Sequence, residues 1–157
     1  MGRPEQWLRY SILAAQREGN RFFSALLAPM ALTPSQAEVL AVVRDFGPLH
    51  LRRLGDLLIC ETGSPSRLVA SLVTKGLLER DPDPGDVRRV IIALTEAGVD
   101  AAAKVRAAEE MLEAVLAERI GDDPGSWDAL VRRLLDGTAS GRALHRRGLW
   151  AEAKGDP

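Results

Sequence analysis

Cysteine and histidine are scarce in this chain of 157 residues, which contains one cysteine and two histidines. The single cysteine, Cys60, cannot form an intramolecular disulfide, and His50 and His145 lie far apart without neighbours at the spacing of a zinc site. The sequence therefore predicts neither a disulfide-stabilised secreted domain nor a bound metal, and it indicates no cofactor.

Long apolar runs are also lacking, because charged residues interrupt every apolar segment well before the roughly 20 residues that a membrane-spanning helix needs. The N-terminus has no basic-then-apolar signal pattern. We therefore expect no membrane association and a cytoplasmic location. Hydrophobic residues at 46% and charged residues at 27% are typical of a globular chain, and the length suits one unit over residues 1–157.

The chain has no excess of either charge, since its formal net charge is -1, and this gives no general attraction to a polyanion. Its arginines are nevertheless clustered locally, whereas many acidic residues fall between positions 109 and 123 on a predicted solvated helix face. The clustered arginines are Arg52, Arg53, Arg67, Arg80, Arg88, Arg89, Arg132, Arg133, Arg146 and Arg147. Any binding of nucleic acid must therefore depend on local charge.

Motifs of catalysis are missing as well. The sequence has no Gly-rich phosphate loop, no paired carboxylates in an apolar setting, and no nucleophile with a recognisable base. We therefore do not expect an enzyme.

Apolar residues recur at helical spacing over residues 5–27, and Pro29 marks the end of that helix. A second helix is predicted from Thr33-Pro34, an N-cap followed by a proline, to Gly47. A third is predicted at about residues 50–58. Its predicted inner face consists of Leu51, Leu54, Leu57 and Leu58.

A fourth predicted helix has the clearest ends, because Ser64-Pro65 supplies an N-cap and a proline at the first position, and Gly76 follows the last turn. The residues predicted to face inward are Leu68, Val69, Leu72 and Val73. Those predicted to lie on the opposite side are Ser66, Arg67, Ala70, Ser71 and Thr74. A face of short, polar side chains suits close approach to a DNA groove, and the alternative interpretation is a face that is simply exposed to solvent.

Strand character follows at residues 77–80 and 87–94, with Pro82-Asp83-Pro84-Gly85 predicted as an exposed turn between them. Thr95 then caps a long helix that reaches residue 120. After a break at residues 121–125, a last helix is predicted over residues 126–135, with a weaker continuation through Gly137 and Gly141. The expected fold class is mainly α with a small β-hairpin.

A helix, a turn, a second helix and a hairpin in this order predict a winged helix-turn-helix, and hence recognition of duplex DNA by a helix in the major groove and a basic finger beside it. Arg67 can bond guanine O6 and N7 or a phosphate, and Ser66 and Ser71 can donate to either.

In the hairpin, Arg88 and Arg89 come just after a rigid polar turn, so their guanidinium groups are available to a phosphate or a narrow minor groove. Asp86 is placed to orient Arg88 by a charge-assisted bond. The alternative interpretation of these residues is a solvated surface ion pair of small energetic value.

The helix-turn-helix at residues 51–58, 64–69 and 75–80 resembles that of the MarR family of bacterial transcriptional regulators. The wing at residues 86–95 is similar to that family's Asp-x-Arg wing and leads into its Leu-Thr-x-x-Gly helix start. The resemblance implies a homodimer that represses transcription and releases DNA when a small, often phenolic, ligand binds between the dimer and DNA-binding parts. It also implies that Arg88 enters the minor groove.

The resemblance divides the chain into a winged DNA-binding part at residues 34–95, helical dimerisation parts at residues 5–28 and 96–147, and a flexible tail at residues 148–157. Apolar terminal helices support a partner subunit independently, because they carry more apolar surface than one small winged domain covers. The residues concerned are Trp7, Leu8, Ile12, Leu130, Leu134, Leu144 and Trp150. A two-fold dimer predicts a pseudo-palindromic operator with half-sites on the order of 10 bp apart.

The predicted DNA-binding residues are Ser64, Ser66, Arg67, Ser71, Thr74, Lys75, Asp86, Arg88 and Arg89. An effector pocket lined by Tyr10, Arg17 and His50 is indicated by family analogy alone. Some family members sense peroxides through a cysteine in the first helix, which this chain lacks. Cys60 is interpreted as a small buried hydrophobe, with a reactive thiol as the alternative. The rival function is a winged-helix module whose wing arginines meet an acidic protein.

Overall fold

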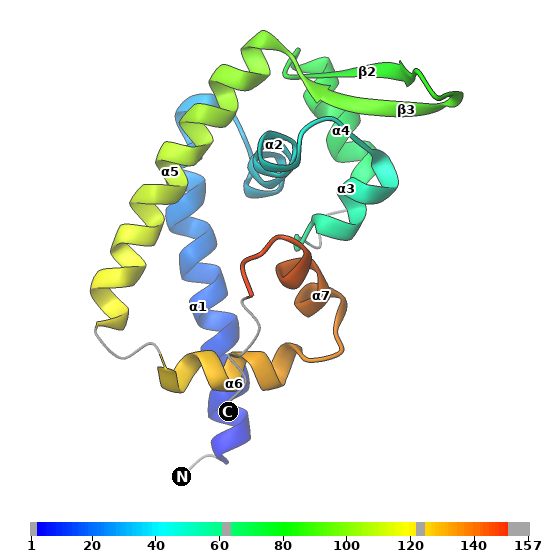
Figure 1. Ribbon diagram of the computed structural model, residues 1–157. Coiled ribbons are helices and arrows are strands. Elements are labelled where there is room, and N and C mark those ends of the chain that lie inside the picture. The colour runs from blue at the N-terminus through cyan, green and yellow to red at the C-terminus, as the bar shows by residue number, and fades with distance from the viewer. Residues whose placement is uncertain (1–2, 61–63, 122–124, 151–157) are drawn as a thin grey trace.

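Helices make up most of the structure, a computed structural model that describes residues 3–60, 64–121 and 125–150 (Figure 1). The end of the turn before the fourth helix (61–63), the centre of the break near residue 121 (122–124) and most of the tail (151–157) lie outside the described residues. The elements in chain order are α1 (Pro4–Leu27), the 3-10 turn η1 (Ala28–Met30), α2 (Pro34–Phe46), β1 (Leu49–His50), α3 (Leu51–Leu57), α4 (Pro65–Thr74), β2 (Leu78–Asp83), β3 (Asp86–Leu94), α5 (Glu96–Ile120), α6 (Gly125–Leu135) and α7 (Ala139–Arg146). The predicted fold class is confirmed.

Side-chain caps define three of the predicted helix starts. Thr33 and Gln36 form a capping box at the start of α2, in which each side chain bonds the other residue's backbone N–H. The Ser64 hydroxyl accepts a backbone N–H in the first turn of α4. At the start of α5 the Thr95 hydroxyl accepts the Gly98 N–H at 3.0 Å. Local sequence thus determines where these helices begin.

The sheet has three strands in the order β1-β3-β2, where the sequence predicted only the hairpin. β1 pairs antiparallel with β3 through Leu49 opposite Ile92 and His50 opposite Ile91. A strand of two residues is too short to show an alternating pattern, so the sequence could not indicate it. Its effect is to fix the start of α3 to the wing.

The turn of the wing is shorter than predicted, because β2 continues through Pro82 and Asp83. A proline fits there because β2 is an edge strand, where no neighbouring strand needs the missing N–H. Pro84-Gly85 alone connects β2 to β3, and the Gly85 N–H donates to Asp83 Oδ1 at 2.8 Å. The prediction of a turn over residues 82–85 was wrong in extent.

α2 forms the centre of the hydrophobic core and lies between the α1–α5 pair and the α3–α4 pair (Figure 1). Its apolar side chains are buried from Ala37 to Val43, whereas Phe46 in the last turn is exposed. The buried apolar residues of α2 are Ala37, Val39, Leu40, Ala41, Val42 and Val43. This central helix connects the packing of the reading head, which we define as residues 34–95, to that of the long terminal helices.

Two residues predicted on inner faces are exposed instead. Leu51 is 38% exposed because it begins α3 at the edge of two surface cavities, and Val73 is 36% exposed in the last turn of α4. The core takes Leu54 and Leu57 from α3, and Val69 and Leu72 from α4. Each of these short helices therefore buries fewer residues than its apolar pattern indicated.

The C-terminal segment forms two helices rather than one weakening helix. Gly137 adopts a left-handed φ of 69° just after α6, a conformation that favours glycine and ends the helix. Thr138 then caps α7, its hydroxyl accepting the Gly141 N–H at 3.0 Å. The predicted continuation of the last helix through Gly137 was wrong, and the break turns α7 back against α3 (Figure 1).

None of the described helices is by itself long and apolar enough to cross a membrane. The segment of α1 and η1 together with α2 has the length and composition for it, but the two parts are bent by 75° relative to each other.

Candidate nucleic-acid interface

The exposed face of α4 carries Arg67, Ala70 and Thr74, whereas Val69 and Leu72 are buried on the opposite side. The side chain of Arg67 forms no hydrogen bond or ion pair with any residue that the structure describes. A charged, unneutralised guanidinium on the first turn of a helix with small neighbours can approach an external anion or a base edge. The expected exposure of Arg67 is confirmed.

Ser64 and Ser66 lie together at the N-terminus of α4. Their hydroxyl oxygens are 2.5 Å apart, and Ser64 Oγ also accepts the Ser66 N–H at 3.3 Å. This pair forms the helix cap, while Ser64 remains exposed and Ser66 is half-buried. Both keep hydrogen-bonding capacity toward the same edge of α4 as Arg67.

Ser71 does not face outward as the helical spacing predicted. Its hydroxyl donates to the Leu68 carbonyl at 2.7 Å and accepts from Gln36 Nε2 at 3.0 Å. The residue lies at the boundary of the two faces of α4, and the buried amide of Gln36 on α2 takes up its hydroxyl. Ser71 therefore holds α4 against α2 instead of presenting its hydroxyl to a groove.

Thr74 and Lys75 end the same helix with local contacts. The Thr74 hydroxyl donates to the Ala70 carbonyl at 3.0 Å, and the Lys75 ammonium donates to the carbonyl of Ala31 in the loop before α2. Both side chains are exposed. Lys75 thereby fixes the C-terminal end of α4 to the end of the α1–η1 segment.

At the tip of the wing, Asp86 pairs with a different arginine from the one predicted. Asp86 Oδ1 accepts the backbone N–H of Arg88 at 3.1 Å, while Asp86 Oδ2 lies 3.5 Å from Arg89 Nε. The carboxylate folds back on its own backbone, as aspartates in turns do, and its ionic partner is Arg89. The Arg88 side chain is exposed and has no partner among the described residues.

His50 joins the two strands of the wing to the start of α3. Its Nδ1 lies 3.2 Å from the Val90 carbonyl, and its Nε2 lies 3.1 Å from Asp83 Oδ2. Both partners accept hydrogen bonds only, so both contacts form together when the imidazole is protonated. His50 thus stabilises the wing, in addition to bordering a groove beside α3.

The three residues predicted to line an effector pocket do not meet in this chain. Tyr10 borders a cavity of about 440 Å³ on α1, together with Trp7, while His50 borders a separate groove of about 630 Å³ between α3 and β3. Arg17 is an exposed residue of α1. Within one chain the three residues therefore share no pocket, and the effector pocket stays a prediction.

Sequence reasoning missed Glu38, which supports the turn before α4. Its carboxylate accepts the backbone N–H groups of Ile59 at 2.8 Å and Cys60 at 2.9 Å, and it pairs with Arg147 at 2.9 Å. The only signal in the sequence was a single acidic residue between Ala37 and other buried positions of α2. Cys60 itself is half-buried, less than a fully buried hydrophobe would be.

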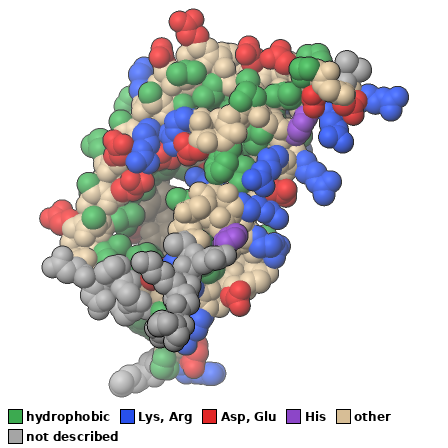
Figure 2. All heavy atoms as spheres, viewed as in Figure 1, with side chains coloured by type: hydrophobic (Ala, Val, Ile, Leu, Met, Phe, Trp, Pro, Cys, Tyr) green, Lys and Arg blue, Asp and Glu red, His purple; other side chains and the backbone are tan. Residues whose placement is uncertain are grey.

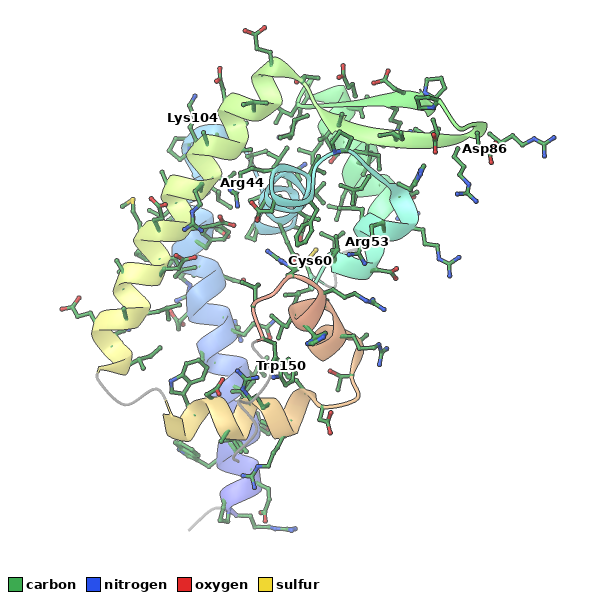
Figure 3. All side chains as sticks on the ribbon, in the orientation of Figure 1. Arg44, Arg53, Cys60, Asp86, Lys104 and Trp150 are labelled. Atoms are coloured by element: carbon green, nitrogen blue, oxygen red, sulfur yellow. The ribbon has the colours of Figure 1, made fainter. Side chains whose placement is uncertain are left out.

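Basic side chains gather on one side of the reading head. Figure 2 shows Lys and Arg side chains at the tip of the wing and along the surface below it, and Figure 3 shows Arg53 on α3 in that region with Asp86 at the wing tip. The reading-head arginines without a partner among the described residues are Arg52, Arg53, Arg67 and Arg88. The local charge that the sequence required is present despite the near-zero net charge.

Known proteins share this arrangement. A family model described as a winged helix DNA-binding domain matches residues 32–98. The multiple antibiotic resistance protein MarR of Salmonella typhimurium is 25% identical over 126 residues, which are 79% of this chain and 88% of that protein. The HTH-type transcriptional regulator MgrA of Staphylococcus aureus is 30% identical over 93 residues, which are 59% of this chain and 63% of that protein.

A solved structure of a MarR mutant from E. coli, complexed with operator DNA, matches 82% of this chain and 93% of its own with a TM-score of 0.73 and 25% identity. The chain belongs to the MarR family. An organohalide-sensing regulator in its 2,4-dichlorophenol-bound form shares the fold of this MarR-family chain, with a TM-score of 0.75 and 17% identity over 88% of this chain and 83% of its own.

The structural match of this MarR-family protein extends beyond the winged domain, since the aligned 82% of the chain is longer than residues 32–98. The terminal helices are therefore part of the shared fold. Within the part of the chain that the structure describes, no group of three or more His, Cys, Asp and Glu side chains is placed to hold a metal ion.

Proposed function

We propose that this MarR-family protein is a sequence-specific, duplex-DNA-binding transcriptional regulator that acts as a homodimer and as a repressor released by a small molecule. The observation that carries the proposal is the pair of unneutralised arginines, Arg67 on α4 and Arg88 at the wing tip. Each lies on the element that its function requires, a helix for the major groove and a finger for the minor groove.

The proposed roles differ between the residues of the interface. Arg67 and Ser66 contact base edges or phosphates, and Arg88 enters the minor groove, with Ser64, Thr74 and Arg89 contacting the backbone nearby. Asp86 shapes the wing tip through its bonds to Arg88 N–H and Arg89. Ser71 and Lys75 act as positioning residues, because their polar groups are bonded to Gln36 and to the Ala31 carbonyl.

The terminal helices are proposed to form the dimer interface, with residues 5–28 and 96–147 as the dimerisation parts and residues 34–95 as the DNA-binding part. Large apolar side chains lie exposed on α1, on the second half of α5 and on α6. They are Trp7, Ile12, Leu13, Phe22, Met111, Leu116, Ile120, Trp127, Val131 and Leu134. Exposed apolar surface of this extent is typical of an interface between subunits.

The proposed effector is a small aromatic compound, a class supported by the dichlorophenol-bound relative. Since Tyr10 and His50 border separate cavities, a pocket that uses both needs the second subunit. We propose further that the protein is not an enzyme and that it is located in the cytoplasm, where the duplex DNA of a bacterium lies.

Selection of bound duplexes from a random pool, followed by sequencing, tests this function. We expect an enriched inverted repeat whose half-sites lie on the order of 10 bp apart, the spacing that a two-fold dimer imposes. Affinity for the enriched duplex should fall linearly in log salt, with a slope of about -0.9 per neutralised phosphate. A folded protein that enriches no sequence, and binds no duplex with such a slope, would instead be a winged-helix module for an acidic protein partner.

A further inference from the structure

A groove of about 630 Å³ lies between the first turn of α3 and strand β3 of the wing. The residues that line it are His50, Leu51, Arg52, Arg53, Asp56, Arg89 and Val90. Three arginines thus face a single carboxylate there. None of the DNA-binding roles assigned so far uses Arg52 or Arg53.

The carboxylates of this region already pair with other basic side chains. Asp56 Oδ1 lies 3.8 Å from Arg146 Nη1, Asp83 Oδ2 lies 3.1 Å from His50 Nε2, and Asp86 Oδ2 lies 3.5 Å from Arg89 Nε. The side chains of Arg52 and Arg53 are exposed and form no hydrogen bond or ion pair with any described residue. Arg44 and Arg147, by contrast, are paired with carboxylates, so the two adjacent unpaired arginines leave a local excess of positive charge.

The groove continues into a second cavity that borders α4, the helix proposed to enter the major groove. This cavity, of about 200 Å³, is lined by Leu51, Ser66, Val69, Arg80, Val90 and Ile92, and it shares Leu51 and Val90 with the groove. One surface therefore leads from the first turn of α4, past the underside of β3, to Arg52 and Arg53. A DNA strand that contacts Ser66 and the wing has a path into the groove.

We propose that Arg52 and Arg53 bind backbone phosphates of the strand that passes the wing, so that the groove is a second phosphate-contact surface of the reading head. The inference rests on the proposed function and extends the DNA contact from α4 and the wing to α3. Guanidinium groups match phosphate geometry and stay charged at every relevant pH. Because phosphates carry no direct sequence information, these two residues set affinity and register and leave base preference unchanged.

The test compares the parent with R52Q/R53Q on the duplex that the parent enriches from a random pool, by fluorescence anisotropy over a series of NaCl concentrations. The slope of log affinity against log salt should become shallower by about 0.9 for each lost phosphate contact, or roughly 1.8 per subunit. Reselection with the variant should enrich the same sequence. The control, K104Q, removes one exposed positive charge from the first half of α5, away from the exposed apolar side chains proposed for the dimer interface, and should keep the parent's slope.

An R52Q/R53Q variant that keeps the parent's slope and affinity overturns this inference and leaves the proposed function intact. A parent that binds no duplex overturns the proposed function itself. Circular dichroism and thermal melting check the fold of the variant, and phosphate-ethylation interference on the parent gives an answer that needs no variant. Ethylation beyond the wing contact should block binding, and free tolerance of ethylation there would also overturn the inference.

Discussion

The Glu38 carboxylate and the Arg147 guanidinium form an ion pair of 2.9 Å between α2 and the residue that follows α7, and both side chains are largely buried, at 16% and 13% exposure. The same carboxylate accepts two backbone N–H groups from the turn after α3. One carboxylate therefore connects the C-terminal helix to the turn that leads into α4. Because each of its bonds is charge-assisted, the connection is stronger than a surface ion pair.

Replacing Arg147 with methionine keeps most of the side-chain bulk and removes the charge. We expect Arg147→Met to destabilise the fold by about 1.5–3 kcal/mol, the range for hydrogen bonds to charged groups, because Glu38 loses its only ionic partner among the described residues. Urea denaturation measures this change. Hydrogen exchange at the Ile59 and Cys60 amides should also accelerate, since both amides bond the same carboxylate.

Arg142→Met is the matched control for this prediction, because the Arg142 side chain is exposed on α7 and, among the described residues, bonds only the Gly137 carbonyl. Its effect should stay within about 0.5 kcal/mol, as is usual for surface substitutions. Equal stability losses in the two variants, or unchanged exchange at Ile59 and Cys60 in Arg147→Met, would contradict the role of the pair.

The sequence predicted what depends on nearby residues. The caps Thr33, Ser64 and Thr95 bond atoms two or three positions away, so the helix starts could be read directly. The Glu38–Arg147 pair joins residues 109 positions apart, and no local pattern indicates it. β1 was not predicted although its residues are adjacent in sequence, because a strand of two residues has too little pattern to detect.

The interface was predicted at the level of elements and missed in its pairings. Helical spacing placed Ser71 on the outer side of α4, but a residue at the boundary of a helix face turns to whichever partner is available, here Gln36. In the wing, the spacing of Asp86 and Arg88 indicated a side-chain pair. The turn instead bends the Asp86 carboxylate onto the backbone and leaves Arg89 as its ionic partner.

Removing the guanidinium from the recognition helix should affect specificity as well as affinity. We expect Arg67→Ala to weaken binding at the selected site by roughly 1–3 kcal/mol and to relax base preference at one position in each half-site. The control is Arg88→Ala, which should weaken binding to all duplexes about equally, because the minor groove and phosphates carry little sequence information. Selection from a random pool with each variant compares the two, and identical preference profiles for Arg67→Ala and the parent would exclude base contact by Arg67.

Glu109 makes stability depend on pH. Burial raises the pKa of the Glu109 carboxyl above its ordinary value of 4.5, and the nearby Arg44, 3.3 Å away, only partly opposes this. Since the folded chain holds this proton more tightly than the unfolded chain, the stabilising contribution is present below pH 4.5 and is lost as the pH rises through the raised value.

Glu109→Gln removes that titration. We expect the free energy of unfolding of the parent, minus that of Glu109→Gln, to decrease as the pH rises from 4.5 through the raised pKa and then to level off. Urea denaturation at a series of pH values gives the difference curve. A curve that rises with pH would mean that the ion pair with Arg44 outweighs burial.

Gly98 allows the first turn of α5 to pack directly against the backbone at Leu77. A Cβ at this position would lie 1.9 Å from the Leu77 carbonyl oxygen, an impossible approach, and backbone cannot move away as a side chain can. We expect Gly98→Ala to destabilise the fold by roughly 1–3 kcal/mol through overpacking, measured by urea denaturation. Gly19→Ala provides the control, because Gly19 lies within α1 and a Cβ there would meet open space, so alanine should stabilise the helix by about 0.5–1 kcal/mol. Changes of opposite sign in the free energy of unfolding would show that the glycine of the Leu-Thr-x-x-Gly motif is needed for close packing of α5 on the chain after α4. A neutral Gly98→Ala would leave that motif without a structural reason.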